Sequence, residues 1–179
     1  MGKYNIYIIC KTEEDFLEKS KEISSKYKAK ICHIHWIPAE YLKLTQCNKK
    51  LLKDLDTRWN TEKNKILAKL GTIAAHRKAL LAIYMNKTDN NIVLEADATL
   101  SHQLPNPPKV SCYMGGWIIP PQITKAGKVK INVKPKNGLN KIEYGTFSVL
   151  MAHSLFIKTF EEAMELFQTT ITDKIKNYD

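Results

Sequence analysis

The chain has 179 residues, of which 44% are hydrophobic and 26% are charged, which predicts one globular domain over residues 1–179 with a substantial core. No apolar run approaches the ~20 residues that span a bilayer, so we expect no transmembrane segment. Four separated cysteines and no signal-peptide pattern before Tyr4 favour free thiols, and hence a protein in the cytoplasm or peripheral on the cytoplasmic face of a membrane.

The net charge of +10 fits an anionic partner, which could be nucleic acid, a membrane surface or a phosphorylated small molecule. The charge alone does not choose among these partners. Because the lysines are dispersed along the chain, a solvated basic surface explains them equally well.

The first elements alternate strand and helix. An apolar run over Tyr4–Cys10 predicts a buried strand, and Thr12 predicts the N-cap of a helix over Glu13–Lys26, whose first turn is acidic. A second strand is expected over Lys28–Ile37, ending at Pro38. This opening is typical of an α/β protein with a mainly parallel sheet flanked by helices.

A polar segment, Tyr41–Asn64, predicts a surface loop with one short helix around Lys49–Leu55. Apolar residues then recur every three or four positions and predict an amphipathic helix over Glu62–Met85. Gly71 lies inside this pattern, so we expect it to allow close packing and not to end the helix. His76 lies on the flank of the same helix.

The next strand, over Asn91–Leu94, is short and apolar, and the carboxylates Glu95 and Asp97 follow it directly. Charges at a strand end must be solvated, paired or bound to a cation. Carboxylate oxygens suit Mg²⁺ or Mn²⁺, so the pair is a candidate metal site, although such a pair often only meets solvent or caps a turn.

The second half of the chain is predicted from shorter patterns. The expected elements are an irregular proline-rich stretch (Ser101–Pro108), a strand (Val110–Met114), an exposed basic strand or hairpin (Lys125–Lys141), a last core strand (Glu143–Met151) and a final helix (Ser154–Phe167) capped by Ser154 or Thr159.

Three segments in this order, Leu70–Leu80, Ile92–Ala98 and Tyr144–Leu150, resemble glycosyltransferase family 25, the lipopolysaccharide-type and procollagen-galactosyltransferase-like family. The resemblance implies a single GT-A-type, Rossmann-like α/β domain. It also implies a transferase that moves galactose or glucose from a UDP-sugar to a hydroxyl of a saccharide, lipid-linked or protein acceptor, with a divalent cation, Mn²⁺ or Mg²⁺.

The resemblance also implies roles for particular residues. Glu95 and Asp97 would bind the metal. The residues implied for the donor nucleotide sugar are Ile9, Lys11, Gly71, His76 and Arg77. An inverting transfer needs a base near the acceptor hydroxyl, and the late acids Glu143 and Asp173 are the candidates for this catalytic role.

Two departures from the family pattern leave a second interpretation open. Ala96 stands where the family usually has an acid, and the first strand lacks the arginine that commonly follows it. The chain would then be a lapsed GT-A domain that serves as a scaffold. A basic nucleic-acid-binding module ranks third, because Lys125–Lys141 contains no aromatic residue for base stacking.

Overall fold

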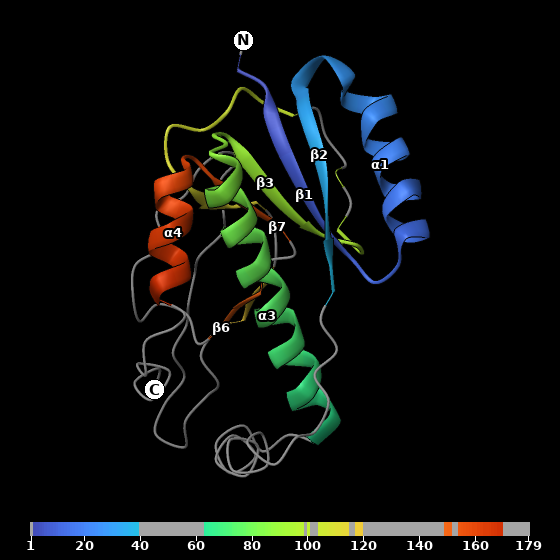
Figure 1. Ribbon diagram of the computed structural model, residues 1–179, viewed down its shortest axis with the longest axis vertical. Helices are drawn as coiled ribbons and strands as arrows, with labels where there is room; N and C mark the ends of the chain where they lie inside the picture. The colour runs from blue at the N-terminus through green and yellow to red at the C-terminus, as the bar shows by residue number, and fades with distance from the viewer. Residues whose placement is uncertain are drawn as a thin grey trace.

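The computed structural model describes residues 2–39, 63–98, 100, 104–114, 117–119, 149–151 and 154–169 (Figure 1). Its elements, in chain order, are β1 (Tyr4–Cys10), α1 (Glu13–Tyr27), the short 3-10 helix η1 (Lys28–Lys30), β2 (Ile31–Pro38), α3 (Lys63–Asn86), β3 (Asn91–Glu95), β4 (Cys112–Tyr113), β5 (Trp117–Ile119), β6 (Val149–Met151), β7 (Ser154–Ile157) and α4 (Phe160–Thr169).

The central sheet has five strands in the order β2-β1-β3-β7-β4. β1 is parallel to both β2 and β3, whereas β7 is antiparallel to its neighbours β3 and β4. Four strands therefore run in one direction and β7 runs in the other. This arrangement confirms the predicted α/β class, the mainly parallel sheet and the predicted strands β1, β2 and β3.

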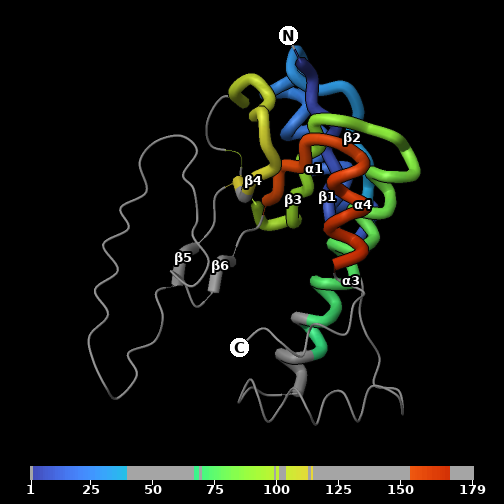
Figure 2. The backbone as a smooth tube through the Cα atoms, turned by 90° about the vertical axis from the view of Figure 1, so that its left-hand side faces the viewer, coloured from blue at the N-terminus to red at the C-terminus, as the bar shows by residue number. Residues whose placement is uncertain are grey.

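β1 lies inside the sheet because all seven of its residues are buried. Tyr7 and Ile9 pack on the face covered by α3 and α4, together with Ala79 and Ala163. Ile6 and Ile8 pack on the opposite face against α1. The strand pleat thus divides one apolar run between two cores, and Figures 1 and 2 show α1 on one side of the sheet with α3 and α4 on the other.

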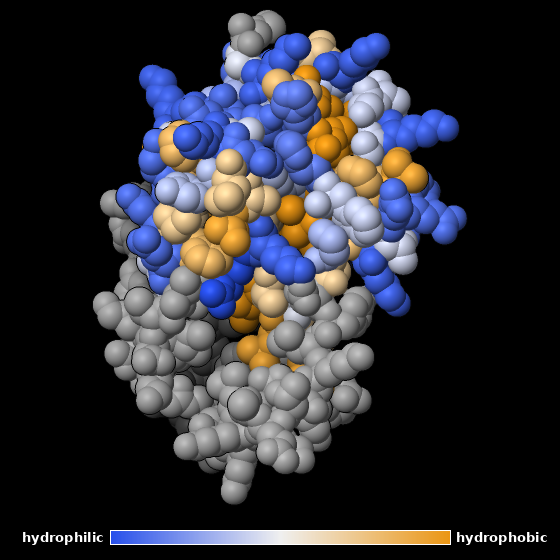
Figure 3. All heavy atoms as spheres, in the orientation of Figure 1, coloured by the Kyte–Doolittle hydropathy of each residue, from blue (hydrophilic) through white to orange (hydrophobic). Residues whose placement is uncertain are grey.

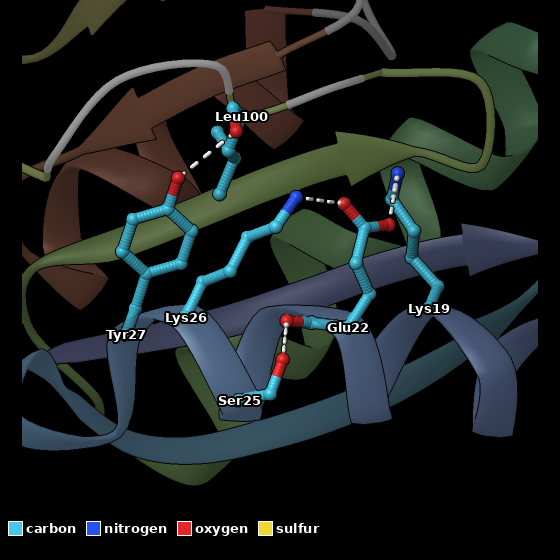
Figure 4. Close-up of polar contacts among 6 residues, drawn as sticks. All are labelled: Lys19, Glu22, Ser25, Lys26, Tyr27 and Leu100. Carbon is cyan, nitrogen blue, oxygen red and sulfur yellow. Dashed lines mark hydrogen bonds and ion pairs between the residues drawn. The ribbon is translucent and has the colours of Figure 1, made fainter.

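α1 begins and ends as its sequence predicts. The Thr12 hydroxyl accepts a hydrogen bond from the backbone N–H of Asp15 at 3.1 Å, which satisfies one of the free amides of the first turn. Ile23 is buried against the sheet, and the Tyr27 hydroxyl donates to the carbonyl of Leu100 at 2.9 Å (Figure 4). These contacts fix α1 over β1 and the segment that follows β3.

α3 covers the other face and confirms the predicted helix within one residue at each end. Its predicted apolar face is only partly buried, because Leu80 lies in the core whereas Ile73, Leu81 and Tyr84 are exposed. The helix continues through Gly71, which is buried. None of the described helices is long and apolar enough to cross a membrane.

The prediction for residues 154–157 is wrong. We expected the first turn of the final helix, but Ser154–Ile157 forms β7, which pairs with β3 through the register Ile92 with Phe156. The final helix, α4, begins only at Phe160. Thr159 is its N-cap, as predicted, because the Thr159 hydroxyl accepts a hydrogen bond from the Glu162 amide at 3.3 Å. β7 pairs with two neighbouring strands, β3 and β4. The hydrogen bonds of this pairing favour a strand over the helix that the spacing of Phe156 and Phe160 predicted.

The prediction of a last core strand over Glu143–Met151 is also wrong for residues 149–151, the part that the structure describes. Val149–Met151 forms β6 and pairs with β5 in a separate two-stranded sheet, not with the central sheet. The start of that prediction, the short helix around Lys49–Leu55 and the basic segment Lys125–Lys141 lie outside the described residues.

Candidate functional site

The chain segments that follow β1 and β2 lead to opposite sides of β1 in the sheet. The chain leaves β1 through α1 to reach β2 on one side, and it leaves β2 through α3 to reach β3 on the other side of β1. The two helices therefore cover opposite faces (Figure 1). In open α/β sheets, ligands bind outside the carboxyl ends of the strands at such a switch point, here between β1 and β3.

The predicted acid pair lies at this point. Glu95 is the last residue of β3, and its register partner on β1 is Ile9. A turn follows at once, in which the Ala98 amide donates to the Glu95 carbonyl at 3.0 Å. Glu95 is half-buried and Asp97 is exposed. The strand thus delivers two carboxylates to the edge where a polar ligand can reach them.

His76 of α3 meets this pair. Its Nε2 atom lies 2.8 Å from Oε1 of Glu95, and the two side chains are 26% and 23% exposed. α3 places His76 there because the neighbouring Ala75 and Ala79 pack on the sheet, so that the next position points along its edge. His76 therefore fixes one oxygen of Glu95, and the pair is ionic only when the imidazole is protonated.

The residues predicted to approach the nucleotide are placed in different ways. Ile9 is 7% exposed and packs in the core, so that its backbone, not its side chain, faces the edge. Lys11 is exposed just beyond β1. The Cys10 carbonyl is occupied, because the Ala39 amide donates to it at 2.9 Å and the Trp36 indole at 3.2 Å. At the end of β1, the Lys11 side chain therefore offers a positive charge that a ligand can reach.

Arg77 takes another direction from His76. Its guanidinium carbon lies 5.0 Å from the centroid of the Phe167 ring on α4. Both residues line a groove of about 230 Å³ between α3 and α4, together with Ala74, Lys78 and Leu81. Glu95 and Asp97 do not line this groove. We place the candidate metal site at the strand edge because none of the residues that line the groove carries a carboxylate, the ligand that Mn²⁺ and Mg²⁺ prefer.

The donor chemistry at the strand edge fits a divalent cation only in part. Two carboxylates supply the hard oxygen atoms that Mn²⁺ and Mg²⁺ prefer. Within the described ranges, however, no group of three or more His, Cys, Asp or Glu residues is arranged to hold a metal ion. A cation bound here would take its remaining ligands from water and from the phosphates of a nucleotide.

The other predicted site residues add little to this geometry. Gly71 is buried within α3, and Glu143 and Asp173 lie outside the described residues. The sequence patterns did not reveal that His76 would pair with Glu95, because 19 positions separate the two residues. Only the strand order, with β3 beside β1 and α3 above them, brings these two side chains together.

Comparisons with known proteins were made at the level of family models, curated sequences and solved structures. None of the three finds a significant match to this chain.

Proposed function

We propose that this protein is a glycosyltransferase that moves a hexose, galactose or glucose, from a UDP-sugar to a hydroxyl acceptor in a cation-dependent reaction. The observation that carries the proposal is the acid pair Glu95 and Asp97 at the carboxyl end of β3, beside the switch point of a mainly parallel sheet. The GT-A type of fold belongs to the same proposal. The motif resemblance supplies the sugar, and the sheet order supports the position of the site.

The residues at the edge would share the work of donor binding. Glu95 and Asp97 would hold Mn²⁺ or Mg²⁺, and the ion when bound would neutralise the charge of the leaving diphosphate. His76 orients Glu95 through their 2.8 Å contact. Lys11 would meet the phosphates as a point charge from the end of β1. Glu143 and Asp173 remain the candidates for the base that takes the proton of the acceptor hydroxyl.

Calorimetric titration of UDP with Mn²⁺, and with EDTA in place of Mn²⁺, tests this proposal. The wild type should bind UDP in a metal-dependent manner, and Asp97→Asn should weaken that binding by about tenfold or more, because it removes an anionic ligand while keeping the shape of the side chain. Asp89→Asn is a matched control, since Asp89 is an exposed acid that precedes the same strand at its opposite end. It should bind UDP as the wild type does.

A lapsed domain that acts as a scaffold is the second candidate, and one observation favours it. One oxygen of Glu95 is already engaged by His76, and the neighbouring position is Ala96, so that the edge offers fewer ligands than three acids would. If the wild type shows no metal-dependent binding of UDP or of UDP-hexoses, the transferase proposal is wrong and the scaffold replaces it.

A further inference from the structure

The edge of the sheet opposite the candidate site collects lysines. The strands β1, β2, β3 and β4 begin at this edge, and the antiparallel β7 ends there. The segments at these strand ends are residues 2–3, 28–30, 87–90, 104–111 and 158–159. They contain one acid, Asp89, and six lysines, which we call the lysine edge: Lys3, Lys28, Lys30, Lys87, Lys109 and Lys158.

Contacts between the loops make the lysine edge one continuous surface. Lys30 Nζ donates to Asn106 Oδ1 at 2.9 Å, and Lys158 Nζ donates to Asn90 Oδ1 at 2.6 Å. Gly2 lies between these two contacts, since a Cβ added there would lie 3.1 Å from Pro107 Cγ and 3.8 Å from Asn90 Nδ2. Loops far apart in the sequence thus present their lysines side by side, and Figure 3 shows hydrophilic side chains around this end of the molecule.

Three acids lie at the lysine edge or directly beside it. Asp89 belongs to its segments, and Glu161 and Glu162 follow Thr159 in the first turn of α4, where the Ser111 hydroxyl donates a hydrogen bond to Glu162. The acid of α1 nearest to the lysine edge, Glu22, is engaged by Lys19 at 3.2 Å and Lys26 at 2.8 Å (Figure 4). These ion pairs hold the pKa of Glu22 below its ordinary value, with the hydrogen bond from Lys26 as the main cause. At the other end of the strands lie acids, among the described residues Glu13, Glu14, Asp15, Glu95 and Asp97. The described residues are therefore net positive at the lysine edge, where six lysines face Asp89, Glu161 and Glu162, and net negative at the opposite edge, where these five acids face Lys11.

We propose that the lysine edge docks the protein on an anionic phospholipid surface. Lys3, Lys28, Lys87 and Lys109 are exposed, and Val110 next to Lys109 is 57% exposed, so that the edge offers point charges together with one exposed apolar side chain. The five segments contain no Arg, Trp, Tyr or Phe, which removes bidentate phosphate contacts and base stacking as routes to a nucleic acid. Clustered lysines are attracted to anionic lipid headgroups without such contacts.

The docked orientation has a consequence for the candidate site. With the lysine edge on the headgroups, the carboxyl edge with Glu95 and Asp97 faces away from the membrane. Its negative charges are then also kept at a distance from the anionic surface, which favours the same orientation. The proposal does not depend on the transferase function, because it rests on the opposite edge of the sheet.

Co-sedimentation with lipid vesicles tests the docking. The full chain should bind vesicles of phosphatidylcholine with phosphatidylglycerol, should not bind phosphatidylcholine alone, and should be released by salt. The triple variant Lys3→Gln, Lys28→Gln and Lys109→Gln should lose about 100-fold in partitioning, because each lysine near an anionic surface contributes about fivefold. All three side chains are exposed, and an unchanged unfolding midpoint should show that the variant is folded.

A second triple variant, Lys11→Gln, Lys21→Gln and Lys78→Gln, is the matched control, because it removes three exposed lysines that lie outside the lysine edge. It should retain most of the binding, with at most a severalfold loss. Equal loss in both triples would overturn the proposal in favour of unspecific net charge. Absence of vesicle binding by the wild type would also overturn the proposal. If the wild type instead binds a duplex oligonucleotide and the first triple variant does not, the lysine edge is a nucleic-acid-binding surface.

Discussion

Asn91 and Asp97 lie at opposite ends of the same short strand and show how the two edges of the sheet differ. Asn91 is fully buried, and its Nδ2 atom donates to the Thr88 carbonyl at 2.7 Å and to the Ile157 carbonyl at 3.3 Å. Asp97 is exposed in a turn. One edge uses its polar side chains to close the loops between strands, and the other leaves carboxylates accessible to a ligand.

The neighbours of these residues follow the same division. At the first edge, Asn5 Nδ2 donates to the Asp89 carbonyl at 2.9 Å, and the Tyr7 hydroxyl lies 2.7 Å from the Thr88 hydroxyl. At the second edge, the side-chain contact between Glu95 and His76 joins two partly exposed groups. Buried hydrogen bonds specify the fold at the first edge, so substitutions of its buried polar residues should destabilise the protein, whereas the acids at the second edge can be substituted without that cost.

Exchanging the two side-chain types tests this comparison with the largest expected effect. Asn91→Asp keeps the shape but removes both donated hydrogen bonds and places a buried carboxylate against two carbonyl oxygens, so the free energy of unfolding should fall by about 3 kcal/mol or more. The reverse exchange, Asp97→Asn, should change it by less than about 0.5 kcal/mol. Urea denaturation of both variants measures the difference, and similar losses would remove the distinction between the edges.

A smaller effect is expected from pH, through His35. Its ring stacks on Tyr7 with centroids 4.5 Å apart, and its Nε2 atom is buried without a hydrogen-bond partner in the described part of the chain. Burial, and secondly the neighbouring His33, lower the pKa of His35. Since the unfolded histidine has its ordinary pKa of about 6.5, the unfolded state binds the proton first, and stability is lost as the pH falls from there through the lowered pKa.

His35→Gln is the variant that isolates this contribution. Its free energy of unfolding should decrease less between neutral and mildly acidic pH than that of the wild type, because it has no imidazole to protonate at this place. Urea denaturation at several pH values gives the two slopes. If the free energy of unfolding depends on pH equally in the wild type and the variant, other groups cause the acid sensitivity and His35 does not contribute to it.

The smallest effect concerns the pair at the candidate site. A double-mutant cycle with His76→Gln and Glu95→Gln should give a coupling energy of about 0.5 kcal/mol, because both side chains remain in contact with water. A coupling of several kcal/mol would show that this pair supports the fold as the buried asparagine does. The two edges would then no longer differ in kind.

Local patterns were sufficient for the elements that carry their own signal. The seven apolar residues of β1, the Thr12 cap of α1 and the repeated apolar spacing of α3 each specify a conformation over a few neighbouring residues. The α/β class and the acids that follow β3 could be predicted for the same reason. In these segments, backbone preference and side-chain burial favour the same answer.

Tertiary structure decided what depends on partners distant in the sequence. Ser154–Ile157 is a short apolar run compatible with a helix or a strand, and it became β7 because it lies between β3 and β4, where Phe156 is fully buried. The contact of His76 with Glu95 and the assembly of the lysine edge depend on strand order in the same way. The sequence alone determined the chemical groups that each segment carries, and only the packing of the sheet determined which groups meet, because strand pairing joins residues whose separation no local pattern encodes.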